Sequence, residues 1–413
     1  MAQLSLAEAD YPTALREWLL AVRRLPGYRA TAISTLAQAP MAARPELVRL
    51  LGRDTDLTAR RIEADLRARW GDPLGGFRVL TAAMPADRVQ AIAVLRGFLD
   101  QLRTMRSQGA RRTEGMVLEA IAARSPAAQA SRARLEAAQA YTAAGDRASA
   151  RRMLGGLADD RATPASVASD AATTLIGVLV AEGKLDDAAQ RLAQLRPTLS
   201  ADDYDAIRRR IAFGWMKQGS LARADSAIKA DSSVEGLALS GRIHLYQGDI
   251  KGAVDRFKAA GPYAGDRAEA THRTILLALL QPLDRDSLAD LGGALLKLEQ
   301  GDTVQAAAGL ERVAAELPAP QGGAELYLLA GRLSAASGKP VEAERLLRAA
   351  AVKEAPSTAP AAELALAELL ISGQRGAEAV EILEHLILTY SRSALVPQAR
   401  RKLDEARGAV PKT

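Results

Sequence analysis

The chain contains no cysteine, and aromatic residues make up only 4% of its 413 residues. Without cysteine there can be no disulfide, no thiolate-bound metal and no catalytic thiol. The three histidines lie far apart in the sequence, and none has a partner at the spacing that zinc sites on helices require. These absences exclude disulfide-stapled folds and thiol enzymes, and we expect neither a metal nor any other cofactor.

Long apolar runs are also missing, although 48% of the residues are hydrophobic. No stretch approaches the roughly 18 apolar residues that cross a bilayer, so we expect no transmembrane segment. Residues 1–6 lack the basic and apolar regions of a signal peptide. There is no phosphate-binding loop, dinucleotide-binding glycine motif or serine-hydrolase elbow. We therefore expect a protein that is not an enzyme.

Alanine and leucine supply most of the apolar content, and β-branched runs of strand length are almost absent. Alanine loses no side-chain entropy in a helix and leucine loses little. The composition therefore predicts an all-α protein. Its length exceeds one ordinary globular core but suits a continuous array of helical repeats.

Positive charge is concentrated in the first third of the chain. Residues 1–135 hold 21 arginines against 13 acidic residues, a net charge of +8, whereas the remainder carries −2. One interpretation is a GC-rich genome that encodes arginine in place of lysine. The other is a basic surface for an acidic partner, because arginine pairs with carboxylates and phosphates through two hydrogen bonds. We do not expect nucleic acid, because no basic run exceeds Arg208–Arg210 and no aromatic stacking platform accompanies it.

A short pattern recurs along the chain and is clearest around Gly248. Gly248 suits a turn with positive φ after a helix, and Asp249 can cap the next helix. Ala253 lets the two helices approach, and Phe257 fills the space between them. The same order of glycine, alanine five residues later and a bulky apolar residue nine residues later follows Gly145, Gly183, Gly219, Gly248, Gly301 and Gly338. A seventh unit opens at Gly373, with its alanine one place late.

The spacing between turns is in the mid-thirties, which indicates one helix pair per unit. We place the turn of the fourth pair at Gly109. The exception is the 53-residue interval from Gly248 to Gly301, which predicts an inserted helix over Arg267–Leu280. The glycine pairs at 155–156 and 292–293 predict close helix packing.

This spacing and phase resemble the tetratricopeptide repeat (TPR) family, whose 34-residue motif has Gly-Asp-Tyr at the turn and proline near the end of the second helix. Ala9-Asp10-Tyr11 with Pro26 and Gly301-Asp302 with Pro318 match that motif. The resemblance implies an all-α, right-handed α–α superhelix, a TPR-like solenoid of about eleven helix pairs. We divide it into degenerate N-terminal repeats (1–135), regular repeats (136–265), an inserted helix or bend (266–286) and C-terminal repeats with a capping helix (287–413).

In this family the first helix of each pair lines the concave groove, at positions 13, 10, 6, 3 and 2 before the turn glycine. Carried onto this chain, the resemblance implies a partner-binding groove formed by Arg61, Arg69, Arg96, Arg103, Arg106, Arg132, Arg209, Phe213, Arg242, Tyr246 and Arg332. Such a groove suits an acidic peptide or a C-terminal carboxylate. The alternative is that these arginines only solvate an exposed helix face. Because the chain has no asparagine, the lysine–asparagine carboxylate clamp of chaperone-binding TPR proteins is not expected.

The resemblance implies a non-catalytic scaffold that binds a protein or peptide along this groove. The alternative is the superhelical accessory region of a cell-envelope enzyme or assembly, similar to lytic transglycosylases or outer-membrane assembly lipoproteins. Residues 384–403 are similar to a junction common in bacterial envelope repeat proteins, and the alternative is a polar capping helix that shields the last apolar face of the solenoid. The first turn falls so early that we expect further sequence upstream. A leader there would imply the periplasm or cell envelope, and its absence the cytoplasm.

Overall fold

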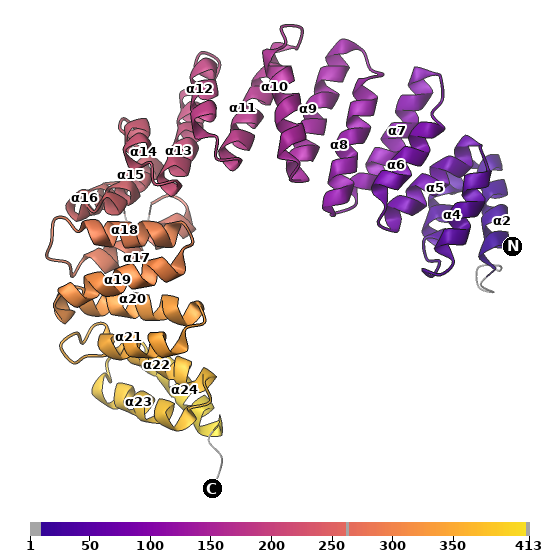
Figure 1. The fold of residues 1–413 in the computed structure, drawn as a ribbon. Coiled ribbons are helices and arrows are strands. Elements are labelled where there is room, and N and C mark those ends of the chain that lie inside the picture. The colour runs from indigo at the N-terminus through magenta and orange to yellow at the C-terminus, as the bar shows by residue number, and fades with distance from the viewer. Residues whose placement is uncertain (1–9, 262–263, 410–413) are drawn as a thin grey trace. The chain divides into compact units, whose positions relative to one another are not determined.

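The computed structural model describes residues 10–261 and 264–409, and every regular element in these ranges is a helix. The chain forms two compact units, residues 1–200 and 201–413 (Figure 1). The all-α expectation is confirmed, and the helices follow one another as TPR-like pairs. The section boundaries predicted at 135, 265 and 286 stay predictions.

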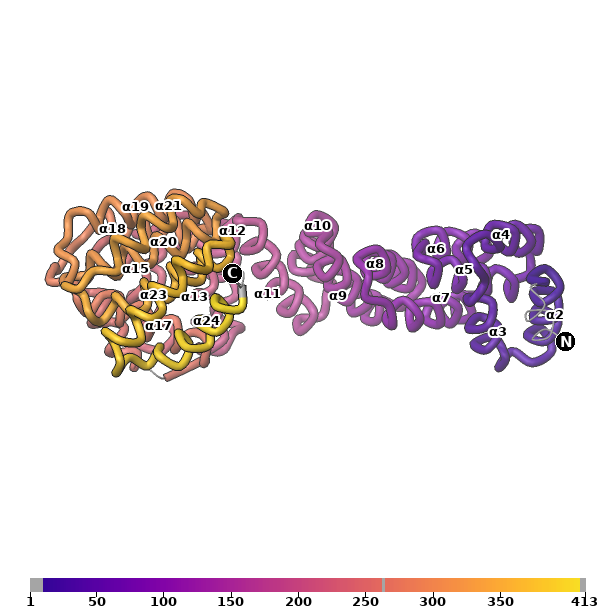
Figure 2. The backbone as a smooth tube through the Cα atoms, turned by 90° about the horizontal axis from the view of Figure 1, so that it is seen from below, coloured from indigo at the N-terminus to yellow at the C-terminus, as the bar shows by residue number. Residues whose placement is uncertain are grey.

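Over its described residues, 10–200, unit 1 contains one leading α-helix, which the short 3₁₀ helix η1 (Pro26–Tyr28) follows, and five α-helix pairs. In the view of Figure 2, the first helices of the pairs form one row and the second helices form the other. The leading helix is α2 (Tyr11–Arg24), and the pairs are α3 (Arg29–Leu36) with α4 (Arg44–Arg53), α5 (Leu57–Arg69) with α6 (Pro73–Ala82), α7 (Arg88–Arg103) with α8 (Gln108–Ala122), α9 (Ala127–Ala143) with α10 (Arg147–Asp159), and α11 (Ala165–Ala181) with α12 (Leu185–Leu195).

The described residues of unit 2, 201–261 and 264–409, also contain five α-helix pairs, together with two unpaired α-helices and the short 3₁₀ helix η2 (Ala319–Gln321). The pairs are α13 (Ala201–Lys217) with α14 (Leu221–Ile228), α15 (Val234–Gln247) with α16 (Ile250–Ala260), α18 (Ala289–Glu299) with α19 (Thr303–Glu316), α20 (Gly323–Ala336) with α21 (Pro340–Ala350), and α22 (Ala359–Ser372) with α23 (Gly376–Thr389). The unpaired helices are α17 (Arg267–Leu280) and α24 (Val396–Ala409). The inserted helix predicted over Arg267–Leu280 is confirmed with the same bounds.

The recurring turn has the predicted physical basis. At Gly248 φ is +85°, and the Oδ1 atom of Asp249 accepts a hydrogen bond of 2.9 Å from the backbone N–H of Gly252. The aspartate thereby satisfies one of the free N–H groups at the start of α16. Positive φ is shared by the turn glycines Gly71, Gly145, Gly183, Gly219, Gly301 and Gly338. The alanine five residues after each of the six regular turn glycines is fully buried.

Two turns differ from the prediction. Gly109 is wrong as the turn of the fourth pair, because it lies in the first turn of α8. The connection there is residues 104–107, and Ser107 caps α8 through a 3.2 Å hydrogen bond from the N–H of Ala110. In the seventh unit Gly373 has an ordinary φ of −84°, and Gln374 takes the left-handed conformation with φ +60°.

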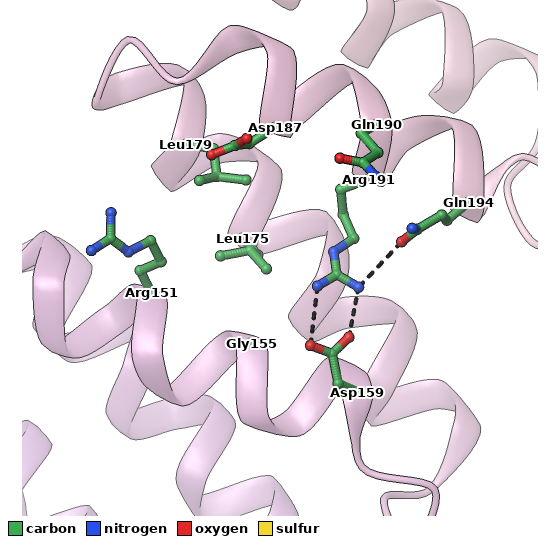
Figure 3. A pocket seen from close by; sticks show the side chains of 9 residues that line it. All are labelled: Arg151, Gly155, Asp159, Leu175, Leu179, Asp187, Gln190, Arg191 and Gln194. Carbon is green, nitrogen blue, oxygen red and sulfur yellow. Dashed lines mark hydrogen bonds and ion pairs between the residues drawn. The ribbon is translucent and has the colours of Figure 1, made fainter.

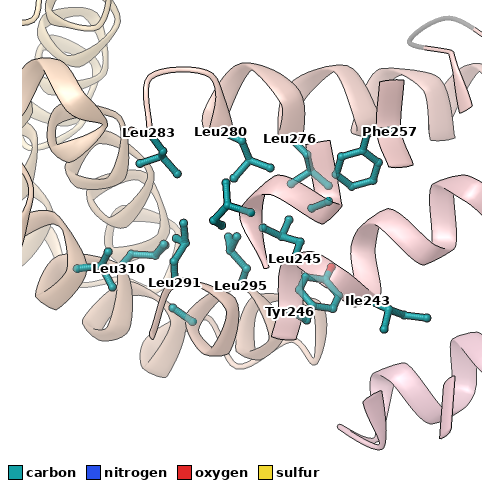
Figure 4. Packing of buried hydrophobic residues seen from close by; sticks show 14 of the residues in the cluster. Ile243, Leu245, Tyr246, Phe257, Leu276, Leu280, Leu283, Leu291, Leu295 and Leu310 are labelled. Carbon is teal, nitrogen blue, oxygen red and sulfur yellow. The ribbon is translucent and has the colours of Figure 1, made fainter. Parts of the chain in front are cut away.

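The helices of each pair meet through small residues. A Cβ atom on Gly241 would lie 2.5 Å from the ring of Phe257, so only glycine lets α15 and α16 pack this closely. Leu276 and Leu280 of α17 join the same apolar core (Figure 4). The inserted helix is therefore part of the packed interior of unit 2.

The two glycine pairs behave differently. A Cβ on Gly292 would lie 2.6 Å from the backbone nitrogen of Gly248, which confirms close packing at that position. Added Cβ atoms at Gly155, Gly156 and Gly293 would meet nothing within 4 Å. The prediction of close packing is therefore wrong for 155–156, where the glycines leave open space.

The two ends of the chain agree with the sequence as far as they are described. Asp10 caps α2 by accepting from the N–H of Thr13 at 3.1 Å, whereas Ala9 of the predicted first turn lies outside the described residues. At the other end, α24 buries Val396, Ala399 and Leu403 against the last pair, while its role as a capping helix stays a prediction. No helix in the described parts of the chain is long and apolar enough to cross a membrane.

Candidate functional site

The candidate site lies on the first-helix face of unit 1, the surface formed by α3, α5, α7 and α9. Its centre is a group of side chains that we name the arginine cluster: Arg29 on α3 and Arg61, Asp65 and Arg69 on α5. These helices are neighbours in the row of first helices (Figure 2). The side-chain amide of Gln101 on α7 fixes this packing by donating a 2.9 Å hydrogen bond to the backbone carbonyl of Asp65.

Two guanidinium groups of the cluster converge over one point of α7. The Nη2 atoms of Arg61 and Arg29 lie 3.4 and 3.5 Å from the position that a Cβ would take on Gly97. Within the described residues neither guanidinium donates a hydrogen bond, and the nearest carboxylate oxygen belongs to Asp65, 3.9 Å from Nη1 of Arg29. Two positively charged guanidinium groups therefore lie close together, with Asp65 as their acidic neighbour.

Asp65 lies beneath these cations with only 3% of its surface exposed, and its Oδ2 atom accepts no hydrogen bond. Burial raises the pKa of Asp65 to about 6, although the charges of Arg29, Arg61 and Arg69 oppose the rise. Burial and the nearby charge of Arg29 lower the pKa of Arg61. With Asp65 ionised, the cluster has two positive charges in excess.

Further along the same face, a hollow of about 400 Å³ lies between α7, α8 and α9. Arg96, Arg103 and Arg132 line it, together with the acidic residues Asp100 and Glu136. The structure thus brings three of the predicted groove arginines together. Arg96 and Arg132 are exposed and form no ion pair with a described residue.

Arg103 has a different role from its two neighbours. Its Nε donates to Glu114 at 3.0 Å and its Nη2 donates to Glu136 at 2.8 Å. Both bonds tie α7 to the next helices, α8 and α9. Arg103 is therefore neutralised within the fold, and its expected place as a free groove arginine is corrected.

Arg106 and Arg332 complete the expected set outside these clusters. Arg106 lies in the connection between α7 and α8 and therefore not on a first helix. Its groove position was counted from Gly109, which is not the turn glycine of this pair. Arg332 lies exposed on α20.

In unit 2 three of the expected groove residues, Arg209, Arg242 and Tyr246, bind acidic residues of their own chain, whereas the exposed Arg332 forms no ion pair with a described residue. Arg209 donates from Nη1 to Asp231 at 2.9 Å. Arg242 is only 9% exposed and donates from Nη2 to Glu299 at 2.5 Å. The hydroxyl of Tyr246 donates to the same Oε2 atom of Glu299 at 3.0 Å.

Phe213 completes this second cluster. Its ring centre lies 5.1 Å from Cζ of Arg242, at the distance of a cation–π contact. The structure therefore brings Phe213, Arg242 and Tyr246 together, while their place in a partner-binding groove stays a prediction. However, it uses them to hold α13, α15 and α18 against one another.

Sequence reasoning missed several residues of both clusters. Asp65 stands six residues before Gly71, and Glu299 stands two residues before Gly301. Both residues occupy groove positions by the same offsets from the turn glycine. The sequence prediction included only basic and aromatic residues at those positions, so it left out these two acidic residues. Arg29 had no such signal, because its pair has no turn glycine. Glu269, whose Oε1 lies 3.8 Å from Nη1 of Arg242, comes from the inserted helix α17.

A larger hollow of about 530 Å³ opens on the second-helix side of unit 1, between α10, α11 and α12. Gly155 contributes no side chain to its wall, and Leu175 and Leu179 form its apolar floor (Figure 3). Arg191 pairs with Asp159 through two hydrogen bonds of 2.7 and 3.2 Å. Because this arginine is already paired, the hollow does not present it to an anionic partner.

Two of the three histidines take part in local contacts. Nδ1 of His244 lies 2.8 Å from Oδ2 of the cap residue Asp249, and Nδ1 of His385 lies 2.9 Å from Glu363. Over residues 10–261 and 264–409, no three His, Asp or Glu side chains are grouped so that they could hold a metal ion. The candidate site therefore rests on the arginines.

No protein-family model and no curated protein sequence matches the chain. Among solved structures it is similar to a tetratricopeptide repeat protein from Parabacteroides merdae, with 15% identity over 67% of this chain and 98% of that one, at a TM-score of 0.30. The TPR domain of P58(IPK) is 15% identical over 97% of both chains, with a TM-score of 0.24. A chain of the Naa15/Naa10 complex bound to HypK-THB is 12% identical over 99% of this chain and 66% of that one, with a TM-score of 0.37. At these scores the similarities say nothing about the site.

Proposed function

We propose that the protein is a non-catalytic scaffold whose first-helix face in unit 1 binds an acidic segment of a protein partner. The observation that supports the proposal is a contrast between four arginines of this face and two first-helix arginines of unit 2. Arg29, Arg61, Arg96 and Arg132 on this face donate no hydrogen bond to a carboxylate of the described chain. Arg209 and Arg242 of unit 2 are already bound to Asp231 and Glu299.

The face suits an extended peptide. Packed helices lie about 8–10 Å apart, so the row from α3 to α9 is roughly 30 Å long. An extended chain of about nine residues covers that distance. Asp and Glu side chains spaced along it would accept charge-assisted hydrogen bonds from successive guanidinium groups, which are about twice as strong as neutral ones.

The test is the affinity of a fluorescently labelled, glutamate-rich decapeptide for the full chain, measured by anisotropy. In the site variant, Arg96→Glu and Arg132→Glu reverse two charges on the first-helix face. We expect its affinity to fall about tenfold or more, and the affinity of the natural chain to weaken with added salt because the contacts are charged.

The matched control reverses two exposed arginines on second helices, Arg78→Glu on α6 and Arg152→Glu on α10. This variant has the same net charge as the site variant and should bind the peptide within about twofold of the natural chain, because its changes lie outside the binding face. Equal losses in both variants would show attraction to net charge alone and would overturn the proposal.

The bacterial cell-envelope setting also belongs to this proposal. It is supported by the resemblance of residues 384–403 to the junction found in envelope repeat proteins. Fractionation of the native organism tests the location, and recovery of the chain only from the cytoplasm would reject it. Cleavage of cell-wall material by this chain alone would overturn the non-catalytic assignment.

A further inference from the structure

The arginine cluster of unit 1 differs from the rest of the first-helix face in being built around one point. We propose that it binds the phosphoryl group of a phosphorylated side chain within the partner's acidic segment. The inference rests on the proposed function, since that segment carries the group to the site. It specifies the chemical group that binds, a phosphoryl group, and the place where it binds, the arginine cluster.

The first support is convergence. Arg29, Arg61 and Gly97 come from three successive first helices, and the two Nη2 atoms lie 3.5 and 3.4 Å from the position of a Cβ on Gly97. An oxygen placed just above that position lies within hydrogen-bond reach of both guanidinium groups. A side chain at residue 97 would occupy this space, and glycine leaves it open.

The second support is the unmet hydrogen bonding of the cluster. Nε of Arg61 is buried and has no acceptor in the described parts of the chain. Buried polar groups are normally paired, so a group of this kind points to a missing ligand. Arg29 keeps 26% of its side-chain surface exposed, so the cluster is open to a ligand from outside.

The third support is charge. The cluster contains three positive side chains, Arg29 on α3 and Arg61 and Arg69 on α5. Its one negative side chain is Asp65 on α5, and the amide of Gln101 on α7 is neutral. With Asp65 ionised this leaves two positive charges. A phosphorylated serine carries about −1.5 to −2 at pH 7 and has three strong acceptor oxygens. A single carboxylate carries −1 and would leave one cation unmatched.

The test uses three labelled decapeptides with the same acidic sequence and serine, phosphoserine or glutamate at the centre. For the natural chain we expect the phosphoserine peptide to bind about tenfold tighter than the serine peptide, because its extra charge meets two guanidinium groups. The glutamate peptide should lie between them. Arg61→Gln removes a guanidinium group of the binding face, so it should weaken the serine peptide as well; its specific effect is that the ratio of phosphoserine to serine affinity falls from about tenfold to about twofold or less.

Gly97→Ala is the second variant, and it changes no charge. The new methyl group would make ordinary contacts at 3.4 and 3.5 Å with the two arginines, so the helix keeps its fold while the ligand position is filled. The increment for phosphoserine should therefore disappear. Gly109→Ala on α8, where the nearest atom would be 3.8 Å away, is the control and should keep the full increment.

The outcomes separate the two proposals. If all three peptides bind equally and respond to the Arg96/Arg132 charge reversal, the phosphoryl site is rejected and the acidic-segment scaffold stands. If none binds, the scaffold proposal fails and the phosphoryl site fails with it. If inorganic phosphate displaces the phosphoserine peptide at concentrations near the dissociation constant of that peptide, the site takes free phosphate, and the partner-borne group is rejected.

Discussion

Gln374 takes the left-handed conformation five residues before the fully buried Ala379, at the turn between α22 and α23. The N–H of Arg375 bonds to the carbonyl of Leu370 at 2.8 Å, which closes the helix as a Schellman turn does. Among the described residues, every other residue with positive φ is a glycine. The seventh unit therefore keeps the phase of the others, with glutamine at the glycine position.

Replacing Gln374 with glycine should stabilise the last repeats. The left-handed conformation costs an L-residue about 1–2 kcal/mol, and glycine avoids this cost. The greater flexibility of glycine in the unfolded state offsets part of the gain in stability. We expect a gain of about 1 kcal/mol, measured as a higher urea midpoint at unchanged slope. Gly373→Ala, at ordinary φ, is the control and should be neutral or slightly stabilising. A lower midpoint for Gln374→Gly would contradict the turn geometry.

The neighbouring glycines of α18 should respond in opposite ways to alanine. A Cβ on Gly292 would lie 2.6 Å from both the backbone nitrogen of Gly248 and the carbonyl oxygen of Leu245, and backbone atoms cannot move aside cheaply. We expect Gly292→Ala to destabilise unit 2 by about 1–3 kcal/mol. Gly293→Ala meets nothing within 4 Å and should stabilise it by up to about 1 kcal/mol through helix propensity. Thermal melts followed by circular dichroism compare the two, and similar melting temperatures would contradict the close approach of α15 and α18.

The buried carboxyl of Asp65 should make stability depend on pH. Its pKa is about 6 in the folded chain and near 3.9 in an unfolded one, so the folded state binds the extra proton between those values. Binding of this proton therefore increases the free energy of unfolding near pH 4, and this contribution is lost as the pH rises through 6. Asp65→Asn removes the loss and should stabilise the chain at pH 7.5 by about 1–3 kcal/mol, and little at pH 4.

Urea unfolding at the two pH values measures this difference. Asp100→Asn, which changes an exposed carboxyl on α7, is the matched control and should shift the midpoint little. An equal effect of Asp65→Asn at both pH values would show that the carboxyl does not titrate in this window.

The pair of Arg242 and Glu299 should support the structure of unit 2 and have no part in partner binding. Glu299→Leu leaves Arg242 buried without its 2.5 Å partner and should cost about 2–4 kcal/mol. The double change Arg242→Met with Glu299→Leu replaces both charges by apolar groups and should recover most of that loss.

A double-mutant cycle in urea measures the coupling of this pair. The acidic decapeptide provides an independent readout, because the double variant should bind it as the natural chain does. Weaker peptide binding by the well-folded double variant would place the binding face in unit 2.

The helical pattern could be predicted in detail, because its signals act over a few residues. Gly248 and Asp249 determine a turn and a cap through backbone conformation and one hydrogen bond to Gly252. The inserted helix α17 followed from an interval too long for one pair. Gly109 misled because a glycine in the first turn of a helix and a glycine at the turn itself look alike in sequence.

The site could be predicted only in part. The offsets from the turn glycines identified Arg61 and Arg132, which lie on the first-helix face; Arg96 lies there too, although it was counted from Gly109, which is not a turn glycine. The offsets could not show that Arg103 meets Glu114 and Glu136, since these carboxylates lie 11 and 33 residues away on other helices. Nor could they supply Arg29, whose pair has no glycine from which to count.

By itself, the sequence determined which residues form helices, where the helices turn and which small residues lie between them, because these depend on local conformation and short spacing. Only the tertiary structure decided which arginines form no hydrogen bond to a carboxylate. Arg242 is neutralised by Glu299, 57 residues further along the chain, whereas Arg29 and Arg61 converge over Gly97. The pairing of charges depends on which helices are neighbours, and that is a property of the packed chain.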